Sequence, residues 1–193
     1  MEIDQSIVQL GEKLDGWCKD FFAMLGSKNQ AARGRALLRG VAIMKELDAL
    51  KARGLAAITA LLARQGAMPE GERTASLIQG FEFAAKLRHT LSDELSDTDG
   101  VNKTVDLMNE IANALDASGT DARGSGRAVL AVLLDHPDAR VRASAGAYLI
   151  NLMPDRVLPI LREVREKEHA NSAHFTAHWA IRGWELDGSR GKS

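Results

Sequence analysis

Two histidines near the C-terminus have a spacing that could hold a metal ion. His174 and His178 are four residues apart, so a helix would place both imidazoles on one face. The residues between them are Phe175, Thr176 and Ala177, which leaves out the glutamate that zinc hydrolases carry in this motif. We therefore predict that the pair is a partly exposed feature of a helix and that the chain has no metal site.

The single cysteine, Cys18, lacks the surroundings of a nucleophile. A reactive thiol needs a nearby base or positive charge, but Cys18 follows Trp17 and precedes the apolar pair at 21–22. We interpret it as a small buried hydrophobic residue. The chain also has no glycine-rich phosphate loop after a strand and no nucleophile elbow. These observations argue against an enzyme, and we expect no cofactor.

A block of charged and turn-forming residues in the second half indicates a helix-turn-helix unit. Asp135 ends an apolar segment, and Pro137 prevents the first helix from continuing. Asp138 can cap the next helix, whose apolar face begins at Val141. Arg142 and its neighbour at 140 are expected to pair with an aspartate of an adjacent turn, at 135, 138 or 155. The alternative for these arginines is recognition of phosphate or of an acidic partner.

An acidic segment stands out from a chain that is otherwise close to neutral. The 193 residues carry a formal net charge of −1, but residues 92–121 contain eight acids and one base. An acidic surface can attract a basic partner. The candidate partner-binding residues are Asp93, Glu94, Asp97, Asp99, Asp106 and Glu110. The alternative is a solvated linker and helix face without a binding role.

The elements that position these residues are expected to be helices. Alanine (29) and leucine (24) are abundant and no segment alternates as a strand does, which predicts an all-α protein. Apolar spacing and breaks predict about nine helices: 7–25, 29–52, a short helix around 58–62, 77–91, 101–115, 127–134, 139–152, 155–167 and 171–186. A break is expected at Arg53-Gly54 and a loop at 66–71. In the helix after Pro137, we expect residues 141, 145, 149 and 152 to form a buried stripe.

Residues 100–188 resemble a bacterial family of small helical domains built from HEAT-like repeats. The resemblance is carried by Asn102-Lys103, by residues 133–138 (Leu-Leu-Asp-His-Pro-Asp), by Val141-Arg142, by residues 155–161 and by Trp184. It implies stacked antiparallel helix pairs, that is, a HEAT-like α-solenoid. We expect an N-terminal helical half at 1–98, which is either a diverged copy of the repeat or a distinct cap. The HEAT-like half at 99–188 would pack against it as one continuous body, before a frayed tail at 189–193.

Members of that family are often encoded beside polymorphic toxins and are suspected immunity proteins. The resemblance therefore implies a non-catalytic protein that neutralises a cognate toxin by direct binding. Two alternatives stay open: a HEAT-like nucleic-acid-binding protein or DNA glycosylase, and a scaffold that joins two proteins. A glycosylase would need a basic groove with Trp or Tyr and an acid at its centre, and Tyr148, Trp179 and Trp184 all lie in the second half. Nucleic acid is the less expected partner because the chain is mildly acidic.

The expected location is the cytoplasm, without a membrane partner. A single cysteine cannot form an internal disulfide, which fits a reducing compartment. No apolar run approaches the ~20 residues that a membrane helix needs. The first residues, Met1 to Asp4, are acidic and do not resemble a signal peptide.

Overall fold

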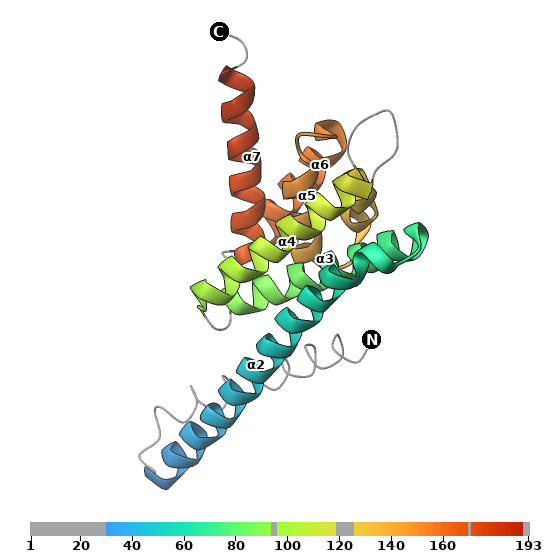
Figure 1. Cartoon of the computed structure of the whole chain (residues 1–193). Helices are drawn as coiled ribbons and strands as arrows, with labels where there is room; N and C mark the ends of the chain where they lie inside the picture. The colour runs from blue at the N-terminus through green and yellow to red at the C-terminus, as the bar shows by residue number, and fades with distance from the viewer. Residues whose placement is uncertain (1–29, 94–95, 119–125, 170, 191–193) are drawn as a thin grey trace. The chain divides into compact units, whose positions relative to one another are not determined.

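The computed structural model describes residues 30–93, 96–118, 126–169 and 171–190. The elements in Figure 1 are α2 (Gln30–Arg64), η1 (Gln65–Ala67), α3 (Glu70–Asp93), α4 (Thr98–Ser118), η2 (Gly126–Asp135), α5 (Ala139–Leu149), α6 (Pro154–Lys167) and α7 (Ser172–Arg190), where η denotes a 3-10 helix. These ranges contain no strand, so the predicted all-α class is confirmed for the described part of the chain. The helix predicted at 7–25, with Cys18, lies outside the described residues.

The break predicted at Arg53-Gly54 is wrong. Helix α2 continues through both residues to Arg64, so two predicted helices are one helix of 35 residues. A glycine inside a helix costs only about 1 kcal/mol relative to alanine, and good helix formers on both sides offset that cost. The loop predicted at 66–71 is also shorter than expected. It is the 3-10 turn η1 followed by Met68 and Pro69, because α3 already begins at Glu70.

The chain divides into two compact units, Met1–Ala57 and Ile58–Ser193. In the first unit, the described residues form α2 up to Ala57 and expose Leu38 and Val41. The second unit contains the end of α2 and every later element. The boundary that we predicted between two halves, near residue 98, lies between α3 and α4. These two helices pack closely against each other, and the proposed relation between the halves stays a prediction.

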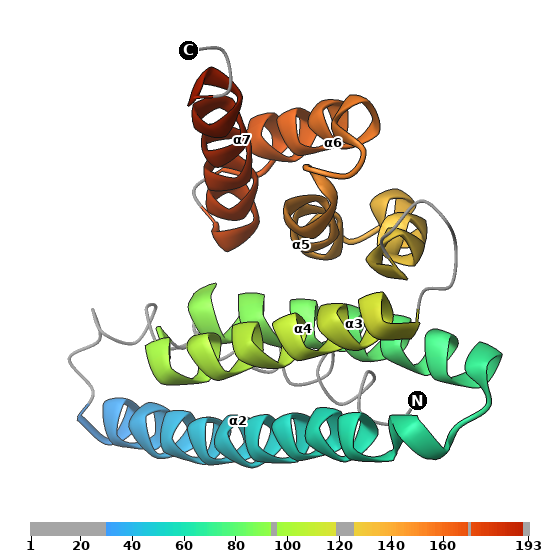
Figure 2. The same ribbon diagram turned by 45° about the horizontal axis from the view of Figure 1, so that its top comes forward.

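Within the second unit, most consecutive elements pack against each other. Helix α3 lies beside α4, α4 contacts η2, and η2 contacts α5 (Figure 2). Helix α5 then packs against both α6 and α7. Because α3 also contacts α5 and α7, these three helices are in mutual contact. Their packing brings the end of α3 next to the start of α7, although about 80 residues separate the two along the chain.

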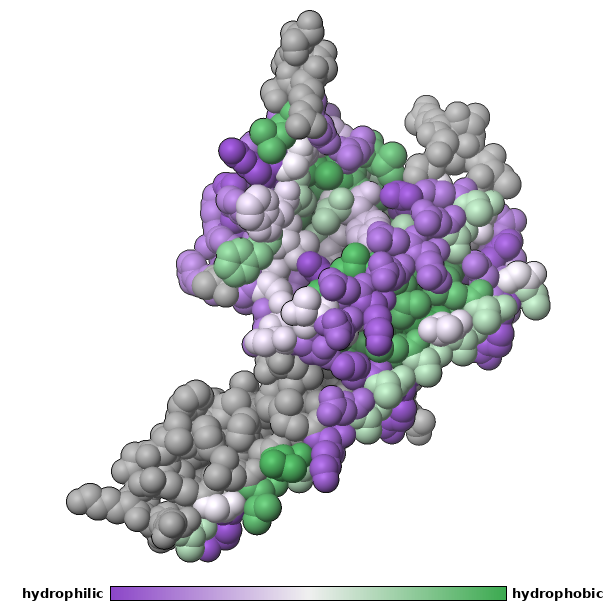
Figure 3. Space-filling model, turned by 60° about the vertical axis from the view of Figure 1, so that its left-hand side comes forward, coloured by the Kyte–Doolittle hydropathy of each residue, from purple (hydrophilic) through white to green (hydrophobic). Residues whose placement is uncertain are grey.

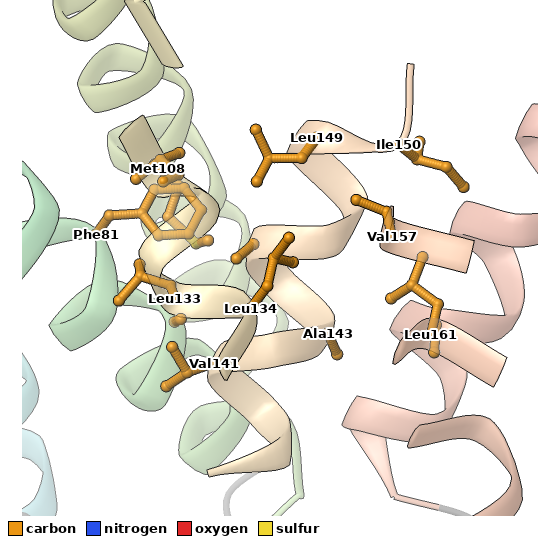
Figure 4. Close-up of a cluster of buried hydrophobic side chains, with 14 of the residues drawn as sticks. Phe81, Met108, Leu133, Leu134, Val141, Ala143, Leu149, Ile150, Val157 and Leu161 are labelled. Carbon is orange, nitrogen blue, oxygen red and sulfur yellow. The ribbon is translucent and has the colours of Figure 1, made fainter. Parts of the chain in front are cut away.

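A single hydrophobic core runs through the second unit. Figure 4 shows Phe81 and Met108 beside Leu133, and Val157 and Leu161 of α6 on the other side of α5. Gly146 allows α5 to approach α6, because a Cβ there would lie 2.7 Å from Leu161 Cδ2. The buried stripe predicted for α5 is correct in part. Residues 141, 145 and 149 are fully buried, but α5 ends at Leu149 and Leu152 is 45% exposed.

The segment predicted as an α-helix at 127–134 is a 3-10 helix instead. It begins at Gly126, where a Cβ would lie 1.8 Å from the backbone oxygen of Leu115. Only glycine fits such a close approach to α4. Asp116 of α4 also binds the first turn of η2, since its carboxylate accepts hydrogen bonds from the Arg127 backbone N–H (2.9 Å) and Nε (2.7 Å). The start of η2 is therefore fixed by the last turns of α4.

Candidate functional site

Two of the predicted partner-binding acids have structural roles. Asp93, the last residue of α3, accepts hydrogen bonds from Ser172 N–H (2.8 Å) and Ser172 Oγ (2.7 Å). Asp97 caps α4, since its Oδ1 accepts from Gly100 N–H at 2.9 Å. Glu94 lies outside the described residues. The carboxylates of Asp93 and Asp97 are therefore hydrogen-bonded within the chain.

The other three predicted acids share one exposed face of α4. Asp99, Asp106 and Glu110 are seven and four residues apart, which places them along one side of a helix. All three are exposed. The structure gives none of them an ion pair or a hydrogen bond with another described residue. We call Asp99, Asp106 and Glu110 the α4 acidic face, which is the part of the predicted acidic surface that stays available to a partner.

The turn between η2 and α5 has the predicted cap but a different pattern of ion pairs. Asp138 accepts from Arg140 N–H at 2.9 Å and also binds the Arg140 guanidinium, with Nη2 2.8 Å from Oδ2. Although burial raises the pKa of Asp138, the bonds from Arg140 lower it overall. Arg142 does not pair with an aspartate, because its Nη1 donates to the backbone oxygens of His136 (2.8 Å) and Pro137 (2.9 Å).

Asp135 makes the contact between neighbouring helices that was expected of Arg140 or Arg142. Its Oδ2 lies 2.9 Å from Nη2 of Arg156, on α6, and the pair is largely exposed. Pro137 is exposed in the turn, and Val141 is fully buried. The turn residues therefore shape and cap this region, and the structure shows no ligand-binding arrangement among them.

His174 and His178 lie side by side on one face of α7, as their spacing predicts. Their rings stack with centroids 6.4 Å apart, and His174 Nδ1 donates to the Arg165 backbone oxygen at 2.9 Å. In the described part of the chain, no group of three or more His, Cys, Asp or Glu side chains could hold a metal ion.

None of the described helices is long and apolar enough to cross a membrane.

A largely buried polar network joins α3, α5 and α7, and no pattern in the sequence predicted it. His89, on α3, is fully buried and lies between two serine hydroxyls. Its Nδ1 contacts Ser172 Oγ, and its Nε2 lies 3.1 Å from Ser144 Oγ. Since the Ser172 hydroxyl donates to Asp93, its oxygen accepts from His89 Nδ1–H, and His89 Nε2 accepts from the Ser144 hydroxyl. We call His89, Asp93, Ser144 and Ser172 the His89 network.

The His89 network holds helices together and is poorly suited to catalysis. Burial and the positive charges of Arg88 and Arg140 together lower the pKa of His89 to about 3, so the ring is neutral at physiological pH. A base with such a low pKa accepts a proton weakly. His89 and Ser144 are also sealed from solvent, which leaves no room for a substrate between them.

An open pocket of about 480 Å³ lies next to this network, between the end of α3, the end of α5 and one face of α7. Helix α7 contributes every third or fourth residue to it, including Phe175, Trp179 and Trp184. Phe175 is 51% exposed and Trp179 is 66% exposed. We call the pocket defined by these residues the α7 pocket. Figure 3 shows one face of the molecule, on which hydrophobic side chains (green) are interleaved with hydrophilic ones (purple).

The polar side of the α7 pocket is provided chiefly by Arg88. Its Nη1 donates to Thr176 Oγ1 at 3.0 Å, and Thr176 in turn donates to the Ser172 backbone oxygen at 2.8 Å. Arg88 Nε is buried and has no hydrogen-bond partner. Ser172 belongs to both sites, since it lines the pocket and also contacts His89.

One signal in the sequence could have indicated the α7 pocket. The stripe of α7 that is buried consists of Ala173, Ala177 and Ile181, while the larger Phe175 and Trp179 are exposed. A helix that buries alanines and exposes aromatic residues has more apolar surface than its own packing uses. Arg88 carried no comparable signal, because nothing around it in the sequence distinguishes it from the other arginines of the chain.

Comparison with known proteins gives the chain no relative. No family model matches it, and neither the curated proteins nor the solved structures contain a match.

Proposed function

We propose that this chain is a non-catalytic protein-binding protein that uses the α7 pocket to anchor its partner. The observation that carries the proposal is the exposure of Phe175 and Trp179 beside a pocket. Aromatic residues next to a pocket are the usual anchors of protein interfaces, where a few of them supply most of the binding energy. The buried His89 is a weak base without access to a substrate, which is consistent with a protein that binds and does not catalyse.

The narrower proposal is that the partner is a bacterial toxin and that the chain is its immunity protein. The resemblance of residues 100–188 to the toxin-associated HEAT-like family motivates it, together with the stacked, roughly nine-helix solenoid that the resemblance implies. In this proposal the protein acts in the cytoplasm. The α4 acidic face supports the narrower proposal because three available carboxylates would attract a toxin with a basic surface.

The test is to co-express the chain with the protein encoded beside its own gene and to measure growth and the Kd of the complex. We expect protection, and we expect Phe175→Ala and Trp179→Ala to weaken binding about 30-fold each, as loss of an anchor costs about 2 kcal/mol. Val132→Ala is the matched control, since Val132 is 62% exposed on η2 but does not line the pocket. Unchanged toxicity would refute the immunity proposal. A Kd that Val132→Ala changes as much as Trp179→Ala does would refute the anchoring role of the pocket.

A second candidate, nucleic-acid binding of the glycosylase type, is favoured by one observation. The α7 pocket brings Trp179 and Trp184 together with Arg88 and Asp187, so aromatic rings and an acid surround one cavity. Among its described lining residues only Arg88 is basic, whereas affinity for a phosphate backbone needs several positive charges. Affinity for duplex DNA that falls steeply with salt would support this candidate, and affinity that is absent or independent of salt would refute it.

A further inference from the structure

We propose that the α7 pocket recognises the free C-terminal carboxylate of a partner protein whose last residue has a large apolar side chain. Arg88 would bind the carboxylate and the aromatic residues of α7 would contact the side chain. This inference rests on the proposed function, because it names the chemistry of the segment that the protein-binding pocket accepts.

The donors of Arg88 are arranged so that one end of the guanidinium is free for a ligand. Nη1 donates to Thr176, and Nε is buried and unpartnered. The third nitrogen, Nη2, has no hydrogen bond within the described chain, and it is not among the buried unpartnered atoms. Because Arg88 lines the α7 pocket, Nη2 is the nitrogen that a molecule in the pocket would meet. Thr176 fixes the orientation of the group before any ligand binds.

The charge of Arg88 is not balanced by a carboxylate in direct contact. Two other partly buried arginines of this unit have such partners, since Arg127 pairs with Asp116 and Arg140 pairs with Asp138, whereas Arg142 donates to backbone oxygens. After Tyr148, the group that raises the pKa of Arg88 is the carboxylate of Asp93, whose oxygens already accept from Ser172. Burial lowers the pKa of Arg88, which shows that the positive charge is poorly solvated. An entering carboxylate would supply the missing partner through a charge-assisted hydrogen bond.

The walls of the pocket select the kind of carboxylate. Phe175, Trp179 and Trp184 line it together with small residues of α5 and α7, so the pocket that Arg88 enters has a large apolar part. A C-terminal residue carries its carboxylate and its side chain on the same carbon, so both groups fit into one cavity of about 480 Å³. An internal Asp or Glu would need an apolar side chain from a neighbouring residue, which points in another direction. Asp187 at the pocket also disfavours multiply charged anions such as nucleotide phosphates.

The experiment titrates the full chain with N-acetylphenylalanine and follows the indole N–H signals of Trp179 and Trp184 by NMR. We expect both signals to shift and to saturate with a Kd of about 1 mM, as estimated from about 0.3 kcal/mol per ligand atom. N-acetylphenylalaninamide, which lacks the charge, should bind at least about 10-fold more weakly. N-acetylaspartylphenylalaninamide tests the internal carboxylate and should also bind at least about 10-fold more weakly.

Variants of two arginines on α3 give a matched comparison. Arg88→Met should weaken binding of the acid about 10-fold while leaving the affinity for the amide unchanged, and Arg88→Lys should have a smaller effect because it keeps the charge. Arg73→Met is the control, since Arg73 Nε is also buried and unpartnered but Arg73 does not line the pocket.

Several results would overturn the inference. These are the absence of saturable shifts, equal affinity for the acid and the amide, tighter binding of the aspartyl probe, or equal losses in Arg73→Met and Arg88→Met. If the probes fail but Trp179→Ala still weakens binding of the toxin, the proposed function stands and only the carboxylate inference falls. If both fail, the pocket has neither role.

Discussion

Arg88 and His89 are neighbours on α3, but their side chains enter two regions with opposite properties. Both ring nitrogens of His89 have hydroxyl partners, and His89 and Ser144 are closed to solvent. Arg88 has one partner, Thr176, and opens onto a pocket with exposed aromatic residues. A buried polar network whose groups are all satisfied stabilises one packing arrangement, whereas donors and apolar surface that remain unused are available to a ligand. The comparison therefore separates residues that build the fold from residues available for binding.

The largest expected effect is a loss of stability in acid. His89 has a pKa of about 3 in the folded protein and about 6.5 when unfolded, so between these values the unfolded chain binds more protons. Its contribution is fully present above pH 6.5 and is lost as the pH falls, by about 1.4 kcal/mol per pH unit and about 3 kcal/mol by pH 4.5. Urea unfolding between pH 7.5 and 4.5 measures this slope. His89→Gln, which does not titrate, should remove most of it, and an unchanged slope in that variant would assign the acid sensitivity to other groups.

Replacing His89 should destabilise the protein at neutral pH by an amount similar to, or smaller than, the loss expected in acid. We expect His89→Leu to lower the free energy of unfolding by about 1–3 kcal/mol, because the Ser144 and Ser172 hydroxyls lose a buried partner. The exposed His169 provides the control, and His169→Leu should stay within about 0.5 kcal/mol of the wild type. Equal effects of the two substitutions would mean that the His89 network is not a stabilising feature.

Replacing Arg88, unlike replacing its neighbour His89, should not lower the stability of the protein. Arg88→Met removes a poorly solvated charge but keeps an extended side chain, so we expect stability to rise by about 1 kcal/mol or stay unchanged. Thermal unfolding at pH 7 measures the change. A loss above about 2 kcal/mol would place Arg88 among the structural residues and would weaken the distinction between the two regions.

The smallest effects are expected at the mouth of the α7 pocket. Because Phe175 and Trp179 are more than half exposed, Phe175→Ala and Trp179→Ala should change the free energy of unfolding by less than about 0.5–1 kcal/mol each. Measured beside the Kd of the complex, the same variants separate binding from folding. A large loss of stability together with the loss of binding would show that the aromatic residues support the helix and do not serve mainly as anchors.

Local patterns predicted the individual helices better than the way in which they are joined. The Asp138 cap and the starts of α6 and α7 lie within a residue of their predicted places, because caps and prolines act on their immediate neighbours. The continuity of α2 through Arg53-Gly54 and the 3-10 form of η2 were not predicted. The continuity of α2 reflects how weakly a single glycine opposes a long helix.

The helical class, the Asp138 cap and the concentration of acids at 92–121 can be read from the amino-acid sequence alone. Which of those acids are available depends on the packing of the helices, since Asp93 and Asp97 bind within the chain whereas the α4 acidic face is exposed. The packing also decided the positions of His89, Ser144 and Ser172, which meet across three helices. Such contacts leave no local pattern because each residue is ordinary in its own helix, and hydrogen bonds over 55 and 83 residues of chain depend on how the helices pack.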